Sequence, residues 1–137
     1  KDFHNGTALH LIANFGTLTM TYLILCRASS KDFLNMMDKE MRTPLMYSVA
    51  GKKHDIRKLL CQCGADVTIK GPDGMTVLHL AAKSGNITAT QIVLENYRQT
   101  ATISKLHRFI NTTDDGHWTP VSSFQSLRIP LLIFLCL

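Results

Sequence analysis

This sequence is poor in charged and aromatic residues. Of its 137 residues, 18% are charged and 7% are aromatic, and tryptophan occurs once. A nucleic-acid interface normally shows a one-sided basic surface with interleaved aromatic residues. The net charge is only +5, and the one local basic group has no Phe, Trp or Tyr within it: Lys52, Lys53, Arg57 and Lys58. We interpret this group as a solvated helix face and expect no direct contact with nucleic acid.

Cysteine is equally sparse, and its spacing argues against the usual cysteine chemistry. The four cysteines are Cys26, Cys61, Cys63 and Cys136. This is not the pattern of a secreted disulfide framework. Cys61 and Cys63 are separated by one residue, whereas zinc ligands are usually separated by two to four. We expect small buried residues rather than a metal site, with a site that includes His54 as the minor alternative.

Long apolar segments are missing too. Residues 1–16 contain no continuous apolar stretch of the kind found in a signal peptide. The apolar run at residues 131–137 is far shorter than the roughly 20 residues that cross a bilayer. We therefore expect an intracellular, reducing location and no membrane span.

No catalytic motif is recognisable. The sequence lacks a glycine-rich phosphate loop, a nucleophile elbow and a metalloprotease His-Glu pair. Asp114 and Asp115 form a carboxylate pair, but adjacent residues on a loop are poorly placed for acid–base chemistry, and a turn explains them well. We predict no catalytic residue, no metal and no cofactor.

A repeated segment dominates what is present. Four stretches are degenerate copies of Gly-x-Thr-Pro-Leu-His, and their threonines are Thr7, Thr43, Thr76 and Thr119. The intervals between them are 36, 33 and 43 residues. The spacing predicts repeats at 1–37, 38–70 and 71–110, the start of a fourth at 111–120, and a non-repeat hydrophobic tail at 121–137.

Each repeat reads as two short helices. In the second, Leu45 and Val49 follow Thr43 in a first helix, and an apolar stripe of Ile56, Leu59, Leu60 and Cys63 marks a second helix. Gly64 stands where a left-handed helix end is needed. The pattern therefore predicts an all-α chain of helix-turn-helix units.

The repeat opener has a physical logic. Threonine caps the amino end of a helix with its hydroxyl, and proline suits the first helical turn because its missing N–H is not needed there. We assign structural roles, with histidine bonding between loops, to Thr7, His10, Thr43, Pro44, Thr76, His79, Thr119 and Pro120.

Two segments depart from the pattern. Between Tyr97 and Ile110 the expected glycine and loop are replaced by other sequence, which we interpret as a loop insertion. After Pro120 the chain no longer reads as a repeat helix. Our preferred interpretation is that the native sequence is interrupted in the fourth repeat. A hydrophobic patch for packing or membrane contact is the alternative.

The pattern from Asn5 to Pro120 resembles ankyrin repeats. This resemblance implies an ankyrin-repeat solenoid that serves as a protein-binding scaffold. A narrower resemblance lies in the string Asp-Asp-Gly-His-Trp-Thr-Pro at residues 114–120. It is similar to the ankyrin region of the euchromatic histone lysine methyltransferases, which methylate lysine 9 of histone H3 through a separate SET region.

In that family the ankyrin array reads mono- and dimethylated lysine on the histone H3 tail, in the nucleus. The resemblance implies that Trp118 corresponds to one wall of the methyl-lysine cage. Ser123 and Ser126 stand where the family has a second tryptophan and a glutamate, so Trp118 is a cage remnant. The other hypothesis is a generic ankyrin adaptor for an unrelated protein partner.

Overall fold

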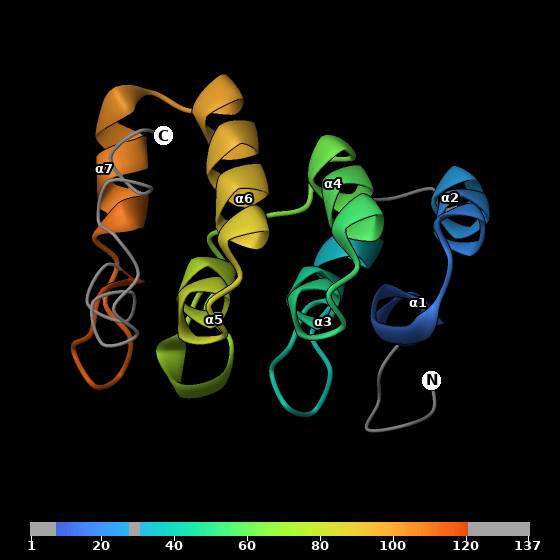
Figure 1. Ribbon diagram of the computed structural model, residues 1–137, viewed down its shortest axis with the longest axis horizontal. Coiled ribbons are helices and arrows are strands. Elements are labelled where there is room, and N and C mark those ends of the chain that lie inside the picture. The colour runs from blue at the N-terminus through green and yellow to red at the C-terminus, as the bar shows by residue number, and fades with distance from the viewer. Residues whose placement is uncertain (1–7, 28–30, 121–137) are drawn as a thin grey trace. The chain divides into compact units, whose positions relative to one another are not determined.

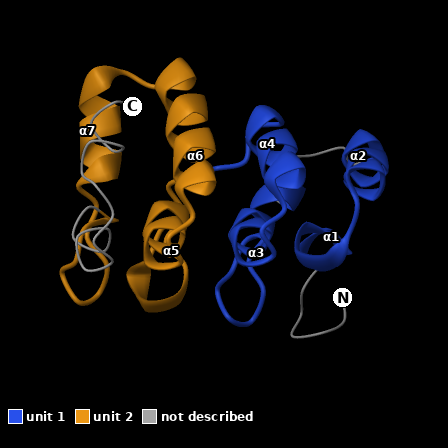
Figure 2. Ribbon diagram, viewed as in Figure 1, with its two compact units in different colours: residues 1–66 blue, residues 67–137 orange. Residues whose placement is uncertain are grey.

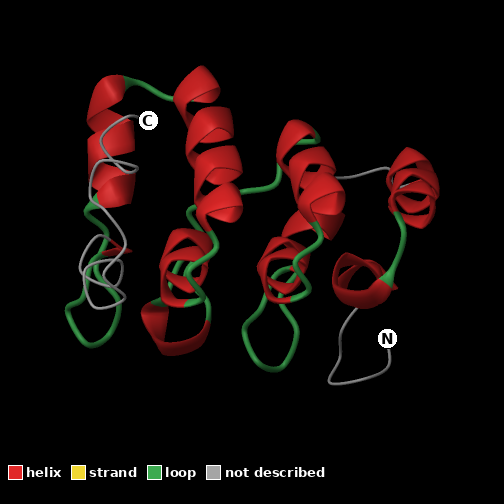
Figure 3. Cartoon of the chain, viewed as in Figure 1, coloured by secondary structure: helices red, strands yellow, loops and turns green. Residues whose placement is uncertain are grey.

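Helices are the only regular secondary structure in the part of the chain that the structure describes. The computed structural model describes residues 8–27 and 31–120, and Figure 3 shows their helices joined by loops. The predicted all-α fold class is therefore confirmed. The chain divides into two compact units, residues 1–66 and 67–137 (Figure 2).

Two helix pairs form the described part of the first unit (Figure 1). They are α1 (Ala8–Phe15) with α2 (Leu18–Arg27), and α3 (Pro44–Ala50) with α4 (His54–Gln62), and the 3-10 helix η1 (Lys31–Asn35) lies between the pairs. Helix α1 packs on α3, and α2 packs on α4. The core contains the buried side chains of Leu9, Ala13, Leu45, Val49, Ile56 and Leu60. Equivalent helices of successive repeats therefore stack on one another.

The second unit contains a third helix pair and one further helix. A 3-10 helix, η2 (Pro72–Gly74), precedes α5 (Val77–Lys83), which packs on α6 (Ile87–Thr100), and α6 in turn packs on α7 (Ile103–Ile110). Its core includes three alanines among larger aliphatic residues: Leu78, Ala81, Ala82, Ala89, Val93 and Leu94. Small residues allow the helices to approach closely.

The helices begin where the sequence provides caps. Thr43 caps α3, with its Oγ1 accepting the N–H of Met46, and Pro44 occupies the first turn. Thr76 and His79 form a reciprocal capping box at the start of α5. Gly64 has a positive φ of 95° after α4, as predicted. Thr7 and the tail at 121–137 lie outside the described residues.

The predicted loop insertion between Tyr97 and Ile110 is wrong. Helix α6 continues to Thr100, and α7 follows after two residues. The reason is that Thr102 caps α7 by accepting the N–H of Lys105, and that Phe109 is buried on α7 with its ring centroid 4.8 Å from that of Tyr97. The additional residues of this repeat thus extend its helical part.

The prediction that the basic group forms a solvated helix face is only partly correct. Lys52 and Lys58 are exposed, but Arg57 is fully buried on α4. One guanidinium nitrogen of Arg57 donates to the Ser48 carbonyl at 3.0 Å, and the other lies 2.9 Å from His54 Nδ1. Arg57 is buried because it stands 14 residues after its opener threonine, the position that Thr21 and Thr90 fill in their repeats, and both of these are buried.

Candidate functional site

Three five-residue loops, at residues 38–42, 71–75 and 114–118, are closed by the same backbone bond and are here termed the tip loops. In each, the first N–H donates to the fifth carbonyl, at 3.1, 2.8 and 3.0 Å respectively. The fourth residue, which is Met41, Gly74 or His117, has a positive φ of 61°, 70° or 64°. The third residue differs, because Asp73 has a positive φ of 56° and Glu40 and Gly116 do not. The closing bond and the conformation of the fourth residue therefore recur in all three loops.

An aspartate side chain stabilises two of these loops. Asp38 Oδ1 accepts the N–H groups of Glu40 and Arg42 at 2.9 and 3.0 Å. Asp114 Oδ1 accepts those of Gly116 and Trp118, both at 2.9 Å. The loop 71–75 begins with glycine and has no such side chain. The carboxylates thus hold loop backbone, which fits a turn role for Asp114 rather than acid–base chemistry.

Opener histidines connect two of the tip loops to helices. His10 Nε2 lies 2.9 Å from the Arg42 carbonyl, and His79 Nε2 lies 2.9 Å from the Trp118 carbonyl. His79 Nδ1 accepts the Thr76 N–H at 3.2 Å, so its Nε2 carries the proton and donates to Trp118. Burial lowers the pKa of His79 below its usual value, which favours this neutral form.

The loop 38–42 carries an additional polar network. The Tyr47 hydroxyl donates to Asp38 Oδ2. Burial alone would raise the pKa of Asp38, but the hydrogen bonds from Tyr47 and from the Arg42 and Glu40 backbone together lower it. Burial and the bond to Asp38 raise the pKa of Tyr47 to about 12. The guanidinium of Arg42 lies 5.7 Å from the Tyr47 ring centroid, which completes a rigid loop base.

Trp118 is the prominent exposed side chain of the third tip loop. The residue is 56% exposed, although its own N–H and carbonyl are both bonded. The loop rests on its neighbour, because the Asp115 N–H donates to the Asp73 carbonyl at 2.9 Å. A Cβ at Gly74 would collide with the Asp115 carboxylate. The indole is therefore presented to solvent from a fixed backbone.

The assigned opener residues are mostly interior. Thr43, Pro44, Thr76, His10 and His79 are buried, Thr119 is half-buried and Pro120 is buried. Trp118 differs from all of them in its exposure. The structure brings His79 and Trp118 together through a backbone bond. Sequence reasoning did not identify the structural roles of Asp38, Tyr47 or Arg57, because polar residue types alone do not indicate burial.

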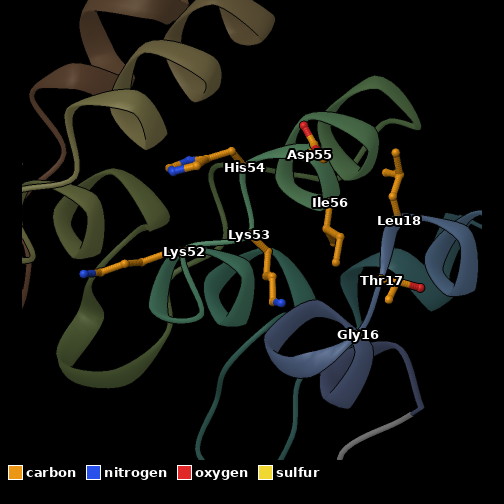
Figure 4. A pocket seen from close by; sticks show the side chains of 8 residues that line it. All are labelled: Gly16, Thr17, Leu18, Lys52, Lys53, His54, Asp55 and Ile56. Carbon is orange, nitrogen blue, oxygen red and sulfur yellow. The ribbon is translucent and has the colours of Figure 1, made fainter.

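A pocket of about 390 Å³ lies in the first unit where the α1–α2 and α3–α4 turns meet. It is lined by Gly16, Thr17, Leu18, Lys52, Lys53, His54, Asp55 and Ile56. Figure 4 shows Lys53 and Ile56 directed toward the turn at Gly16 and Thr17, whereas Lys52 and His54 extend away. Its lining of lysines and aliphatic groups contains no converging set of polar atoms that defines a ligand.

The described ranges 8–27 and 31–120 contain neither a metal-binding cluster nor a membrane-spanning helix. No group of three or more His, Cys, Asp or Glu residues there is arranged to hold a metal ion. Burial raises the pKa of the Cys61 thiol to about 12, so this group stays protonated at neutral pH. None of the helices in those ranges has the length and apolar character needed to cross a membrane.

Stacked helix pairs with recurrent tip loops define a helical-repeat protein of the scaffold class. A family model described as ankyrin repeats, in three copies, matches residues 1–71. The chain therefore belongs to the ankyrin-repeat family, whose repeats form non-catalytic modules for protein–protein binding.

Relatives with diverse names share this repeat. The chain is 35% identical to the nuclear factor NF-kappa-B p105 subunit of Rattus norvegicus over 70% of this chain and 10% of the relative. It is 32% identical to 26S proteasome non-ATPase regulatory subunit 10 of Dictyostelium discoideum over 60% and 32%. It is 33% identical to inversin of Danio rerio over 68% and 9%. The chain thus spans a third or less of these proteins, and none of the three is named as a histone methyltransferase.

Proposed function

We propose that this chain binds a protein partner through its tip loops, with Trp118 as the main contact residue. The exposed indole on a loop fixed by Asp114 and His79 carries the proposal. Tryptophan is enriched among the residues that contribute most to binding. In the first unit, taken by itself, the loop 38–42 exposes Met41, and Met37 is exposed directly before it. A rigid backbone with exposed apolar tips binds at low entropic cost.

The narrower proposal is a portion of a histone H3 tail reader from a nuclear histone H3 lysine 9 methyltransferase. Its support is the resemblance of residues 114–120 and the exposure of Trp118. An exposed tryptophan face attracts a cation. Methyl selectivity needs several aromatic faces and a carboxylate, and Ser123 and Ser126 offer neither. Both serines lie outside the described residues. We therefore expect weak binding of the tail without preference for methylation.

Fluorescence titration tests this proposal directly, because Trp118 is the only tryptophan. The full chain is titrated with histone H3 tail peptides that are unmodified, monomethylated or dimethylated at lysine 9. We expect all three peptides to quench Trp118 with the same dissociation constant. Calorimetry with Trp118→Ala should show that binding is lost.

The control is Ile103→Ala, which removes another strongly exposed apolar side chain of the same unit, located on α7. It should leave peptide binding unchanged. A clear preference for the methylated peptides would show that the cage is functionally complete. Absence of any binding would refute the histone proposal and leave the tip-loop proposal to be tested with other partners.

The second candidate is a generic adaptor for an unrelated partner. The diversity of names among the relatives favours it. Neither candidate places catalysis in this chain, and under the first candidate a SET region would belong to a longer parent. Sequencing the complete transcript decides between the candidates, because a SET-coding segment supports only the first.

The repeat boundaries form part of the same proposal. Tip loops begin at residues 38 and 71, which supports repeats at 1–37, 38–70 and 71–110. The third tip loop begins at Asp114, three residues after the proposed start of the segment 111–120. Limited proteolysis should cut at these loops before it cuts within the helix pairs, and early cleavage inside α4 or α6 would contradict the boundaries.

A further inference from the structure

Helices α2 and α4 are equivalent elements with unequal burial. They occupy the same register, 36 residues apart, so that Met20 corresponds to Ile56. Ile56 is 2% exposed, whereas Met20 is 48% exposed. On the paired first helices, Ser48 of α3 is fully buried, but its counterpart Ile12 is only half-buried. Core positions of one repeat are thus partly open in the preceding one.

The neighbouring repeat explains the difference. Ile56 is covered because α2 packs on α4, and it lines the same pocket as Leu18 of α2 (Figure 4). Met20 occupies the same position on α2 and therefore lies on the opposite side from α4. We term the side of α1–α2 that carries Ile12 and Met20 the open face.

The composition of α1 and α2 does not fit a solvated end. Arg27 is the only charged residue in the two helices. A terminal repeat in an array needs a polar outer side for solubility. Phe15, Tyr22 and Leu23 add exposed apolar surface on these helices, at 75, 59 and 55%. The exposed surface of the pair therefore has the apolar character of a surface between repeats.

We propose that the open face binds a further ankyrin-type helix pair, packed on α1–α2 as α1–α2 is packed on α3–α4. The choice of occupant follows from the interface between α1–α2 and α3–α4. The positions that Ser48 and Ile56 occupy on α3–α4, where both are buried, are occupied by apolar residues on α1–α2. This inference concerns a surface away from the tip loops and does not depend on the proposed function.

A fusion protein tests the occupant. A copy of residues 1–37 is placed ahead of the chain and joined to residue 2, which reproduces the 36-residue interval between Thr7 and Thr43. The copy carries Met20→Lys, so that its own outer side is polar. We expect the fusion to raise the melting temperature by at least about 5 °C, because repeat arrays gain stability from each added interface.

Two substitutions in the original chain separate the open face from general effects. Met20→Lys should abolish the gain in the fusion protein. Tyr22→Lys is the matched control, since its counterpart Lys58 is exposed although α4 is covered, and it should preserve the gain. In the chain without the copy, both substitutions should shift the melting temperature by less than about 2 °C, as is usual for exposed sites.

The remaining outcomes overturn the proposal. A fusion protein that is no more stable than the chain, or whose gain survives Met20→Lys, would show that a helix pair does not bind there. Light scattering of the unmodified chain tests self-association. A dimer that Met20→Lys dissociates and Tyr22→Lys preserves would identify a second copy as the occupant instead.

Discussion

At the scale of single residues, His79 links pH to folding. Burial lowers its pKa, so the unfolded chain binds a proton at higher pH than the folded chain does. The stability that the neutral His79 provides is complete above the unfolded pKa of about 6.5 and decreases as pH falls below it. His79→Gln keeps a donor for the Trp118 carbonyl without titrating.

We therefore expect His79→Gln to reduce the loss of unfolding free energy between pH 7.5 and pH 5. Urea denaturation at both pH values measures it, and His107→Gln, at an exposed residue of α7, serves as the control. If the wild type and His79→Gln lose equal stability over this interval, His79 is not the responsible group.

Gly74 is subject to two constraints that disfavour a side chain at this position. Its φ is +70°, and a Cβ would collide with the Asp115 carboxylate. We expect Gly74→Ala to cost at least about 1 kcal/mol from the backbone alone, measured by urea denaturation, and to shift the Trp118 emission as the loop 114–118 moves. In an Asp115→Ala background the cost should be smaller. An equal cost in both backgrounds would show that the collision is relieved without displacement.

Arg57 shows where charge misleads sequence analysis. It was assigned to a solvated face because arginine is usually exposed, but its repeat position is interior. Its Nε has no hydrogen-bond partner, and Arg57 forms no ion pair with a described residue. The Ser48 carbonyl also accepts the Lys53 N–H at 3.0 Å, so it keeps a partner when the arginine is replaced.

Arg57→Met should therefore leave the free energy of unfolding unchanged or raise it by about 1 kcal/mol, because desolvation of the cation is avoided while volume is retained. Arg57→Ala should lower it by about 2 kcal/mol or more through the cavity it creates. Chemical denaturation measures both. A loss of more than about 2 kcal/mol for Arg57→Met would show that the guanidinium hydrogen bonds outweigh its desolvation.

At the scale of secondary-structure elements, helix starts were predicted better than helix ends. Thr43, Pro44 and Thr76 mark α3 and α5 because capping is a local interaction encoded within four residues. The end of α6 and the whole of α7 were missed. These helical residues are indicated by Thr102, which caps α7, and by the contact of Phe109 with Tyr97. Both are overlooked when the segment is read with the 33-residue repeat period.

Helix α7 depends on one aromatic contact. Phe109 is 3% exposed and is the only buried side chain of that helix. Phe109→Ala should lower the free energy of unfolding by about 3 kcal/mol. In this variant, amide hydrogen exchange should be faster in α7 than in α5. Ile103→Ala, at an exposed position of the same helix, should have little effect. Unchanged protection of α7 in Phe109→Ala would mean that Tyr97 does not anchor the helix.

At the scale of the whole molecule, periodicity predicted the all-α fold because each repeat restates the same local signals. The candidate site was predictable only in part. Trp118 was identified by its neighbours in sequence, but the equivalence of the tip loops depends on backbone hydrogen bonds and on positive φ at Met41 and His117. These are non-glycine residues, so their type gives no indication of the turn that they form.

Cysteine reactivity offers a measure of unfolding in the first unit. Cys26 is exposed on α2, whereas Cys61 is 2% exposed and burial raises its pKa to about 12. A thiol reacts as the thiolate, so Cys61 should be inert in the folded chain.

In a Cys63→Ser/Cys136→Ser variant at pH 8, we expect Cys26 to be labelled rapidly and Cys61 only as the unit unfolds. Leu60→Ala creates a cavity in the core, which raises the unfolded population without altering the exposure of Cys26. It should therefore accelerate only the slow labelling of Cys61. Two fast thiols in the unmodified core would show that α4 opens without unfolding of the unit.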